Sequence, residues 1–409
     1  FPGGTATASL VTPLMRSHIP GNPSPSVVSS EITARALDEG YAAKGPDGND
    51  SWFDPTGLSF VLDDMLHESG VVVLYNTFFS APIVSDGVLK GVIIENKGGR
   101  QAIMAARVID ATGDADVAFA AGCPIESGRP GTSVNQPTSL RFEMGAIRTD
   151  RFVDFLKGLG VRDDLDFPFF HTAMVWNRNW PLESVFRKAV QAGDLEEHDG
   201  HYFQAFGVPG KPGFIAFNCP EIAPAVDVTR PDYQSAAFME GRKALRRLAR
   251  FMKKYFPGFE NACISQAACL LGVRESRRII GEYYLTGRDI LDYTKFEDAV
   301  ARSNYPVDIH GALDEYENYQ RPALPLEDRF FEAPYRCLVP RGVDNLLVTG
   351  RCVSADFVAQ STLRIQPTCR ALGEAAAIAA HLSLGDGVSP RALDGRRVRA
   401  ELKAGGAFL

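Results

Sequence analysis

The segment that most constrains the fold is residues 345–384, where an apolar strand, a glycine turn and a long alanine-rich helix follow one another. Pro367 suits the first turn of this helix, because a proline there gives up no intrahelical hydrogen bond. The backbone N–H groups of Thr368, Cys369 and Arg370 then face forward, at the end of the helix dipole that favours negative charge. This pattern is typical of two arrangements: a helix packed on its own sheet, and a helix whose start binds an anion.

A second strand with the same ending lies earlier in the chain. Residues 108–113 read VIDATG and residues 346–350 read LLVTG, so each is an apolar strand closed by Thr-Gly. We predict two parallel strands that end on the same rim of one sheet. A helix over 56–70 followed by a strand over 71–74 gives the element order of a parallel sheet.

Strong turn signals lie between these elements. Three β-rich pieces, 77–85, 89–96 and 101–110, are separated by Asp86-Gly87 and Gly98-Gly99, which are typical hairpin turns. The sequence therefore predicts an α/β fold that also carries antiparallel hairpins.

The composition limits the classes of function. A chain of 409 residues with 45% apolar side chains is long enough for two domains. The net charge of −7 argues against a nucleic-acid partner, which needs a basic face. No apolar run is long enough to cross a bilayer and no signal-peptide pattern is present, so we expect no membrane partner. Seven cysteines without a CxxC pair indicate reduced thiols and a cytoplasmic protein.

The composition of the sequence changes between residues 141 and 336, where aromatic residues are dense and Pro/Gly loops are frequent. We predict a second domain at 141–336, inserted into a first domain made of 1–140 and 337–409. The second domain includes a basic amphipathic helix over 231–256. A solvated helix face accounts for its charges better than a membrane or nucleic-acid surface does.

Four blocks carry a resemblance to a known family. They are GGTATASLVTPLM at 3–15, VIDATGDADVAFAAG at 108–122, LGVRESRRIIGEYYLTGRDI at 271–290 and the segment 345–384. Together, in this order, they resemble the FAD-dependent oxidoreductases of the glutathione-reductase-type two-dinucleotide-binding class. The resemblance implies a partial Rossmann-like FAD-binding domain with an inserted α+β substrate domain.

The family's proteins begin with a strand, a GxGxxG turn and a helix that bind the FAD pyrophosphate. No GxGxxG occurs in this sequence, and the chain opens with Phe1 and not with Met. We therefore interpret the chain as truncated by roughly 30 to 40 residues, the size of one βαβ unit.

The resemblance also assigns residues to FAD, whose reduced flavin carries negative charge at N1–O2 that a helix start would stabilise. It places Gly3, Gly4, Thr5 and Ala6 by the ribityl chain and ring, Thr77 and Phe78 by the adenine, Ala111, Thr112, Gly113 and Asp114 by the adenosine and pyrophosphate, Gly350 and Arg351 by the pyrophosphate and ribityl chain, and Ile365, Gln366, Pro367 and Thr368 by the N1–O2 edge.

Candidate catalytic groups come from the predicted second domain. Arg274 and Arg277 belong to a charged cluster that could hold a carboxylate or enolate. Internal salt bridges are the alternative, because 274–284 reads as a strand whose alternate residues face opposite sides. His171 and His201 could act as acid or base near neutral pH, or be hydrogen-bonded structural histidines. The run 198–201 is read as a surface loop and not as a metal site.

The sequence thus predicts an FAD-dependent oxidoreductase that acts on a small organic substrate by hydride transfer to or from flavin N5. One alternative is a fumarate-reductase-like reductase of an unsaturated acid. Another is a non-catalytic, degenerate flavoprotein scaffold. The electron donor or acceptor stays open, and a homo-oligomer is compatible with the sequence.

Overall fold

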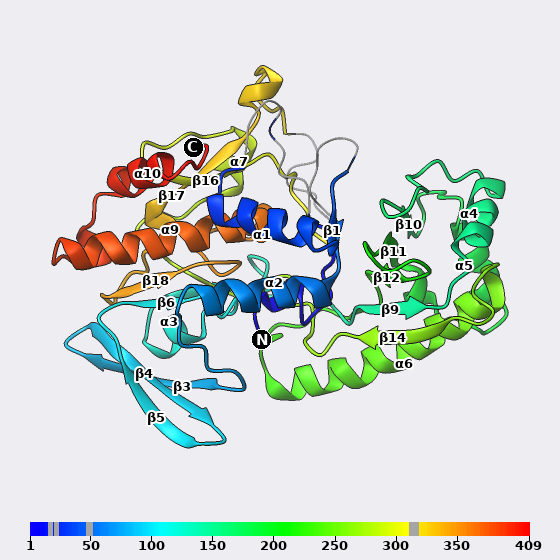
Figure 1. Ribbon diagram of the computed structural model, residues 1–409, viewed down its shortest axis with the longest axis horizontal. Coiled ribbons are helices and arrows are strands. Elements are labelled where there is room, and N and C mark those ends of the chain that lie inside the picture. Colours follow the sequence, from blue (N-terminus) through cyan, green and yellow to red (C-terminus); the bar gives the residue numbers. More distant parts are fainter. Residues whose placement is uncertain (15–18, 20–23, 46–51, 311–318) are drawn as a thin grey trace. The chain divides into compact units, whose positions relative to one another are not determined.

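The computed structural model describes residues 1–14, 19, 24–45, 52–310 and 319–409, in two compact units (Figure 1). The first unit is Phe1–Leu14, Thr33–Val71 and Pro137–Val273, and the second is Met15–Ile32, Val72–Gln136 and Arg274–Leu409. These boundaries differ from the predicted ones at 140 and 336. The predicted cofactor and substrate domains therefore stay predictions. Within the described ranges, no helix is both long and apolar enough to cross a membrane.

The elements alternate along the chain. The helices are α1 (Val27–Asp38), α2 (Pro55–Glu68), α3 (Asp116–Ala120), α4 (Thr149–Gly158), α5 (Glu183–Gln191), α6 (Pro231–Tyr255), α7 (Gly287–Leu291), α8 (Phe357–Leu363), α9 (Gln366–Gly385) and α10 (Gly395–Ala404). The 3-10 helices are η1 (Gly4–Ala6), η2 (Glu197–Gly200), η3 (Leu326–Asp328), η4 (Tyr335–Leu338) and η5 (Pro390–Ala392). The strands are β1 (Ala42–Ala43), β2 (Trp52–Phe53), β3 (Phe78–Ser85), β4 (Val88–Asn96), β5 (Gly99–Met104), β6 (Val108–Asp110), β7 (Ile125–Ser127), β8 (Thr138–Ser139), β9 (Phe142–Gly145), β10 (His171–Val175), β11 (Tyr202–Gly207), β12 (Ile215–Phe217), β13 (Glu221–Ile222), β14 (Cys263–Ala267), β15 (Arg277–Ile279), β16 (Ala299–Ser303), β17 (Phe331–Pro334) and β18 (Leu346–Val348).

The first unit is built on a five-stranded antiparallel sheet in the order β10-β11-β12-β9-β14. Its core is aromatic: Phe142 and Phe217 stack with ring centroids 4.9 Å apart. The apolar stripe of α6 joins the same core through Leu245, Leu248 and Met252. The predicted amphipathic helix is therefore confirmed, and its apolar face is buried while most of its cations are exposed.

The second unit contains the predicted parallel strand pair. Strands β6 and β18 run in the same direction, with Asp110 opposite Val348. Helix α9 packs against both strands, and its small residues Ala375 and Ala379 are fully buried there. The prediction of two strands that end on one rim is thus confirmed, together with the helix behind Pro367.

The predicted hairpins form the three-stranded sheet β3-β4-β5 of the second unit (Figure 1, cyan). Asp86 and Gly87 both have positive φ, at 53° and 73°, as a two-residue hairpin turn of this type requires. The predicted piece 101–110 is not one strand, since it divides into β5 and β6.

Two predicted strands are wrong. Residues 71–74 form no strand, and Val72 is 85% exposed. A strand needs a neighbouring strand to pair with, and none in the described part of the chain pairs with this segment. The predicted strand 274–284 is reduced to β15, because only Arg277–Ile279 pairs with β7.

Candidate functional site

One buried carboxylate at the end of β6 binds the turn that follows this strand. Asp110 is 1% exposed and accepts hydrogen bonds from the backbone N–H of Thr112 at 3.0 Å and of Ala118 at 2.9 Å. The Thr112 hydroxyl donates to the same carboxylate at 2.7 Å. Asp110 therefore shapes the turn 111–114 that the resemblance assigns to FAD, although sequence reasoning gave Asp110 no role.

The two strand ends meet through an ion pair. The Arg351 guanidinium lies 2.8 Å from Asp114 Oδ1, and it donates to Ser276 Oγ at 3.1 Å. The Ser276 hydroxyl in turn donates to Asp114. Gly113 has φ +81°, and a Cβ there would lie 3.1 Å from the Arg351 guanidinium. The structure thus brings together three predicted FAD residues, and the charge of Arg351 is already balanced by Asp114.

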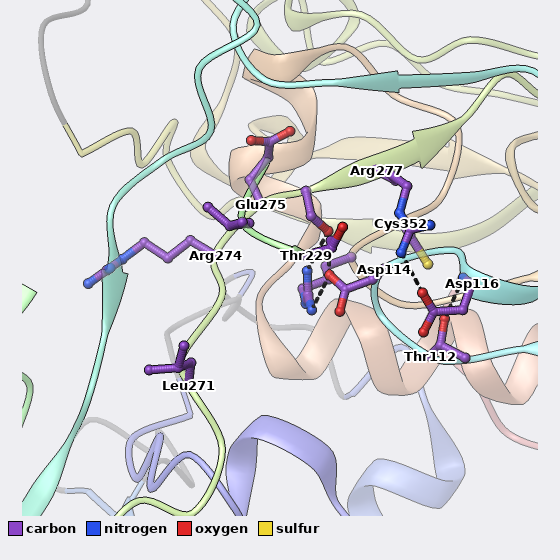
Figure 2. Close-up of polar contacts among 12 residues, drawn as sticks. Thr112, Asp114, Asp116, Thr229, Leu271, Arg274, Glu275, Arg277 and Cys352 are labelled. Atoms are coloured by element: carbon purple, nitrogen blue, oxygen red, sulfur yellow. Dashed lines mark hydrogen bonds and ion pairs between the residues drawn. The ribbon is translucent and has the colours of Figure 1, made fainter. Parts of the chain in front are cut away.

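The side chains of the arginine cluster diverge (Figure 2). Arg277 pairs with Asp116, and burial raises the pKa of this carboxyl. Arg278 is 1% exposed and pairs with Glu275, which is completely buried. The reading as internal salt bridges therefore describes Arg277 and Arg278. In Figure 2 the Arg274 side chain points away from the Arg277–Asp116 pair, and its positive charge acts on Asp308.

Three buried side-chain oxygen atoms of the second unit lack a hydrogen-bond partner in the described structure, and one of them lies in the first turn of α9. Ile365 is the N-cap residue, and no side chain caps this helix end. Thr368 is 1% exposed, and its Oγ1 has no hydrogen-bond partner in the described structure. The same holds for Thr349 Oγ1 and for Gln360 Oε1. Gln360 Nε2 donates to the backbone oxygens of Arg274 and Arg351 at 3.0 and 3.1 Å. Since buried polar groups are normally satisfied, this region fits a polar ligand, as FAD would be.

A charged cluster that sequence reasoning missed lies beside this helix start. Asp308 Oδ2 accepts from Arg364 at 3.0 Å and from the Tyr305 hydroxyl at 3.2 Å. His310 Nε2 lies 3.8 Å from Asp308 Oδ1. Although burial opposes it, the positive charges of Arg364, His310 and Arg274 hold the pKa of Asp308 below its usual value. An Asp-x-His spacing in an extended segment, which puts both side chains on one face, was the signal available.

Two other predicted residues of the second unit lie at the start of its hairpin sheet. The Thr77 hydroxyl donates to the backbone oxygen of Tyr75 at 3.1 Å. Phe78, the first residue of β3, is 76% exposed. Gly350, after the end of β18, has φ +86° and open space where a Cβ would stand.

The remaining predicted residues belong to the first unit. Gly3 and Gly4 have positive φ and lead into η1, where Thr5 is half-buried and Ala6 is buried. His171 stacks on Phe206 with centroids 5.1 Å apart, and burial lowers its pKa. His201 is exposed next to His198. Among the described side chains, no group of His, Cys, Asp and Glu could hold a metal ion.

Comparison with models of protein families identifies one family for this chain. A family model described as FAD dependent oxidoreductase matches residues 1–402. A geranylgeranyl bacteriochlorophyll reductase-like protein from Thermoplasma acidophilum is similar, with 11% identity, a TM-score of 0.40 and coverage of 90% of this chain and 67% of that one. A myxobacterial chondrochloren halogenase has 11% identity and a TM-score of 0.45, with coverage of 95% and 70%. The p-nitrophenol 4-monooxygenase of Pseudomonas putida has 12% identity and a TM-score of 0.32, with coverage of 57% of this chain and 45% of that one. No curated protein matches the chain.

Proposed function

Because the chain belongs to the FAD-dependent oxidoreductase family, we propose that it oxidises or reduces a small organic molecule at carbon. FAD is the cofactor of this family, and when bound it supplies a hydride acceptor or donor at N5. The chain's own residues then have three tasks: to hold the cofactor, to orient the substrate and to move a proton.

The start of α9 is the observation that supports this proposal most. The dipole at this helix start favours negative charge on a ligand, and no side chain of the described structure caps the helix end. Thr368 Oγ1 adds a buried hydroxyl without a partner. We assign Ile365, Gln366, Pro367 and Thr368 to the flavin, and Gly113, Asp114, Gly350 and Arg351 to the rest of the cofactor. Asp114 already pairs with the Arg351 guanidinium. For Arg351 to bind a phosphate of the cofactor, this ion pair must open or be shared with the phosphate.

FAD titration of the purified protein tests the proposal. We expect a yellow protein, and we expect Thr368→Val to weaken FAD binding roughly fivefold, as the loss of one hydrogen bond would do. Thr138→Val is the matched control, because Thr138 is also buried but its hydroxyl pairs with Tyr233 at 2.9 Å. A colourless protein that takes up no FAD would contradict the proposal and support the degenerate scaffold.

A reductase of unsaturated acids is the second candidate. Arg274 is the observation in its favour, because its positive charge acts on Asp308, the carboxylate that also pairs with Arg364. Two arginines near one histidine suit a carboxylate substrate. Mixing dithionite-reduced holoprotein with fumarate or crotonate tests it: rapid reoxidation of the flavin without oxygen supports this candidate, and unchanged reduced flavin excludes both acids.

A further inference from the structure

The segment after β16 carries a histidine and a carboxylate that have not been assigned a role. We propose that His310 exchanges a proton with the substrate, that Asp308 positions His310, and that Gln136 Nε2 binds the oxygen of a substrate hydroxyl or carbonyl. This inference rests on the proposed function and names its substrate class.

The contacts of Asp308 leave one oxygen for His310. Arg364 Nη2 and the Tyr305 hydroxyl both donate to Oδ2, and the backbone N–H of Asp308 donates to Ser361 Oγ at 3.2 Å. The two contacts on Oδ2 orient the carboxylate and the backbone contact holds the residue, so that Oδ1 faces His310 Nε2 at 3.8 Å. That distance is within the range of an ion pair but is longer than a hydrogen bond. Catalytic hydrogen bonds are often this long before the substrate binds.

Gln136 provides an independent sign of a ligand. The side chain is 2% exposed, and its Oε1 accepts from the backbone N–H of His310 at 3.2 Å. This bond orients the planar amide and keeps Nε2 beside the His310 segment. Yet Nε2 has no partner within the described residues. A buried N–H without a partner costs about 1–3 kcal/mol, which an acceptor oxygen on a ligand would remove.

The cluster adjoins the part of the second unit that we assign to the flavin. Arg364 immediately precedes Ile365, the N-cap of α9, and Thr368 lies one helical turn further on. The Arg364 guanidinium also donates to the backbone oxygen of Asp308 at 3.0 Å. One arginine thus joins the carboxylate that faces His310 to the start of α9.

The chemistry follows from these positions. In the oxidation of a hydroxyl compound, the O–H proton goes to the imidazole nitrogen that is turned away from Asp308. The C–H bond breaks, its hydrogen leaves with the electron pair as hydride, and a C=O bond forms; FAD is the oxidant of this step. Asp308 stabilises the imidazolium, and Gln136 Nε2 donates to the reacting oxygen. Among the described residues, the positive charges that act on Asp308 are those of Arg364, His310 and Arg274.

Histidine NMR tests the pair without a substrate. The protein is purified with 13C-labelled histidine and with its FAD, if it takes up FAD. The His310 signal is the one that is missing from the spectrum of His310→Gln. We expect Asp308→Asn to lower the proton affinity of His310 roughly tenfold, because an adjacent negative charge favours the charged imidazole. Asp166→Asn, at an exposed carboxylate, is the control. An unchanged affinity in Asp308→Asn would overturn the pairing.

Turnover tests the catalytic role. Dye-linked oxidation is measured over a panel of primary and secondary alcohols and 2-hydroxy acids. We expect His310→Gln to lower kcat roughly 100-fold with KM and FAD affinity unchanged, and Gln136→Leu to act mainly on KM. Asp308→Asn should move the acid limb of the pH profile to lower pH. His67→Gln, at an exposed histidine of α2, is the matched control.

The outcomes separate the two proposals. Holoprotein that binds FAD but turns over no member of the panel overturns the substrate class and leaves the FAD-dependent function standing. Full turnover by His310→Gln overturns the role of His310 alone. Protein that binds no FAD overturns the proposed function, and the NMR result on His310 and Asp308 can still be read.

Discussion

Lys211 should be the most informative single residue for the stability of the first unit. Its ammonium lies 2.8 Å from Asp54 Oδ1 and 3.6 Å from Glu143 Oε2. Both carboxylates are buried, at 5% and 3% exposure, and Glu143 also accepts from the Ser265 hydroxyl at 2.9 Å. Lys211→Met would leave two buried carboxylates with no cation between them.

The expected loss can be estimated from this geometry. Removing one partner of a buried ion pair costs about 3–5 kcal/mol. We expect the lower end, about 3 kcal/mol, because the Lys211 side chain is 27% exposed and water screens it in part. For a unit of this size, the midpoint of thermal unfolding should fall by roughly 6 to 12 °C.

Tryptophan fluorescence is the assay of choice. The three tryptophans, Trp52, Trp176 and Trp180, all belong to the first unit, so their signal reports the unfolding of that unit in urea. Lys253→Met, at an exposed position of α6, is the matched control and should change the free energy of unfolding by no more than about 0.5 kcal/mol.

The pH dependence gives a second check. Burial, helped by the charge of Asp54, raises the pKa of Glu143, while Lys211 opposes the shift. The folded unit therefore binds this proton more tightly than the unfolded chain, and the Glu143 contribution to stability improves as the pH falls through the raised pKa. Without Lys211 the pKa rises further. The loss in Lys211→Met should then be smaller near about pH 5 than near about pH 7.5. A loss below about 1 kcal/mol, or an equal loss at both pH values, would refute the reasoning.

Two further predictions concern the second unit and the thiols. Arg278→Met should destabilise the second unit by about 3–5 kcal/mol, because it strands the buried Glu275 carboxylate; thermal unfolding by circular dichroism measures this, and a loss no larger than that of the exposed control Arg288→Met would contradict it. Cys263 and Cys269 are exposed, so a thiol reagent near neutral pH should modify these two first. Fast modification of Cys123, whose pKa burial raises to about 11, would contradict that order.

The parts of the structure that could be predicted rest on local signals. The helix α9 follows from Pro367 and an alanine-rich face, and the hairpin turn from Asp86-Gly87. The parallel pairing of β6 with β18 was predictable because both strands end in the same Thr-Gly pattern. Each of these patterns is complete within a few residues, so one sequence is enough to read it.

The missed parts depend on residues that are distant in the sequence. Residues 71–74 read as a strand, but pairing requires a neighbouring strand that the segment itself cannot reveal. Two arginines of 274–278 pair with different carboxylates, Arg277 with Asp116 and Arg278 with Glu275, while the charge of Arg274 acts on Asp308. The cluster around His310 joins Gln136, Asp308 and Arg364, and no spacing along the chain indicates that these three residues meet.

The exposed stretch from Val71 to Tyr75 has a consequence for the protein in concentrated solution. It presents five successive apolar side chains, from 39% to 85% exposed, with no charge and no proline among them. Such a stretch has the composition of segments that pair with their own copies as β-strands. Because this pairing takes two molecules, its initial rate rises with the square of the protein concentration. We therefore expect this segment to affect aggregation during purification at high protein concentration, and not the catalytic chemistry.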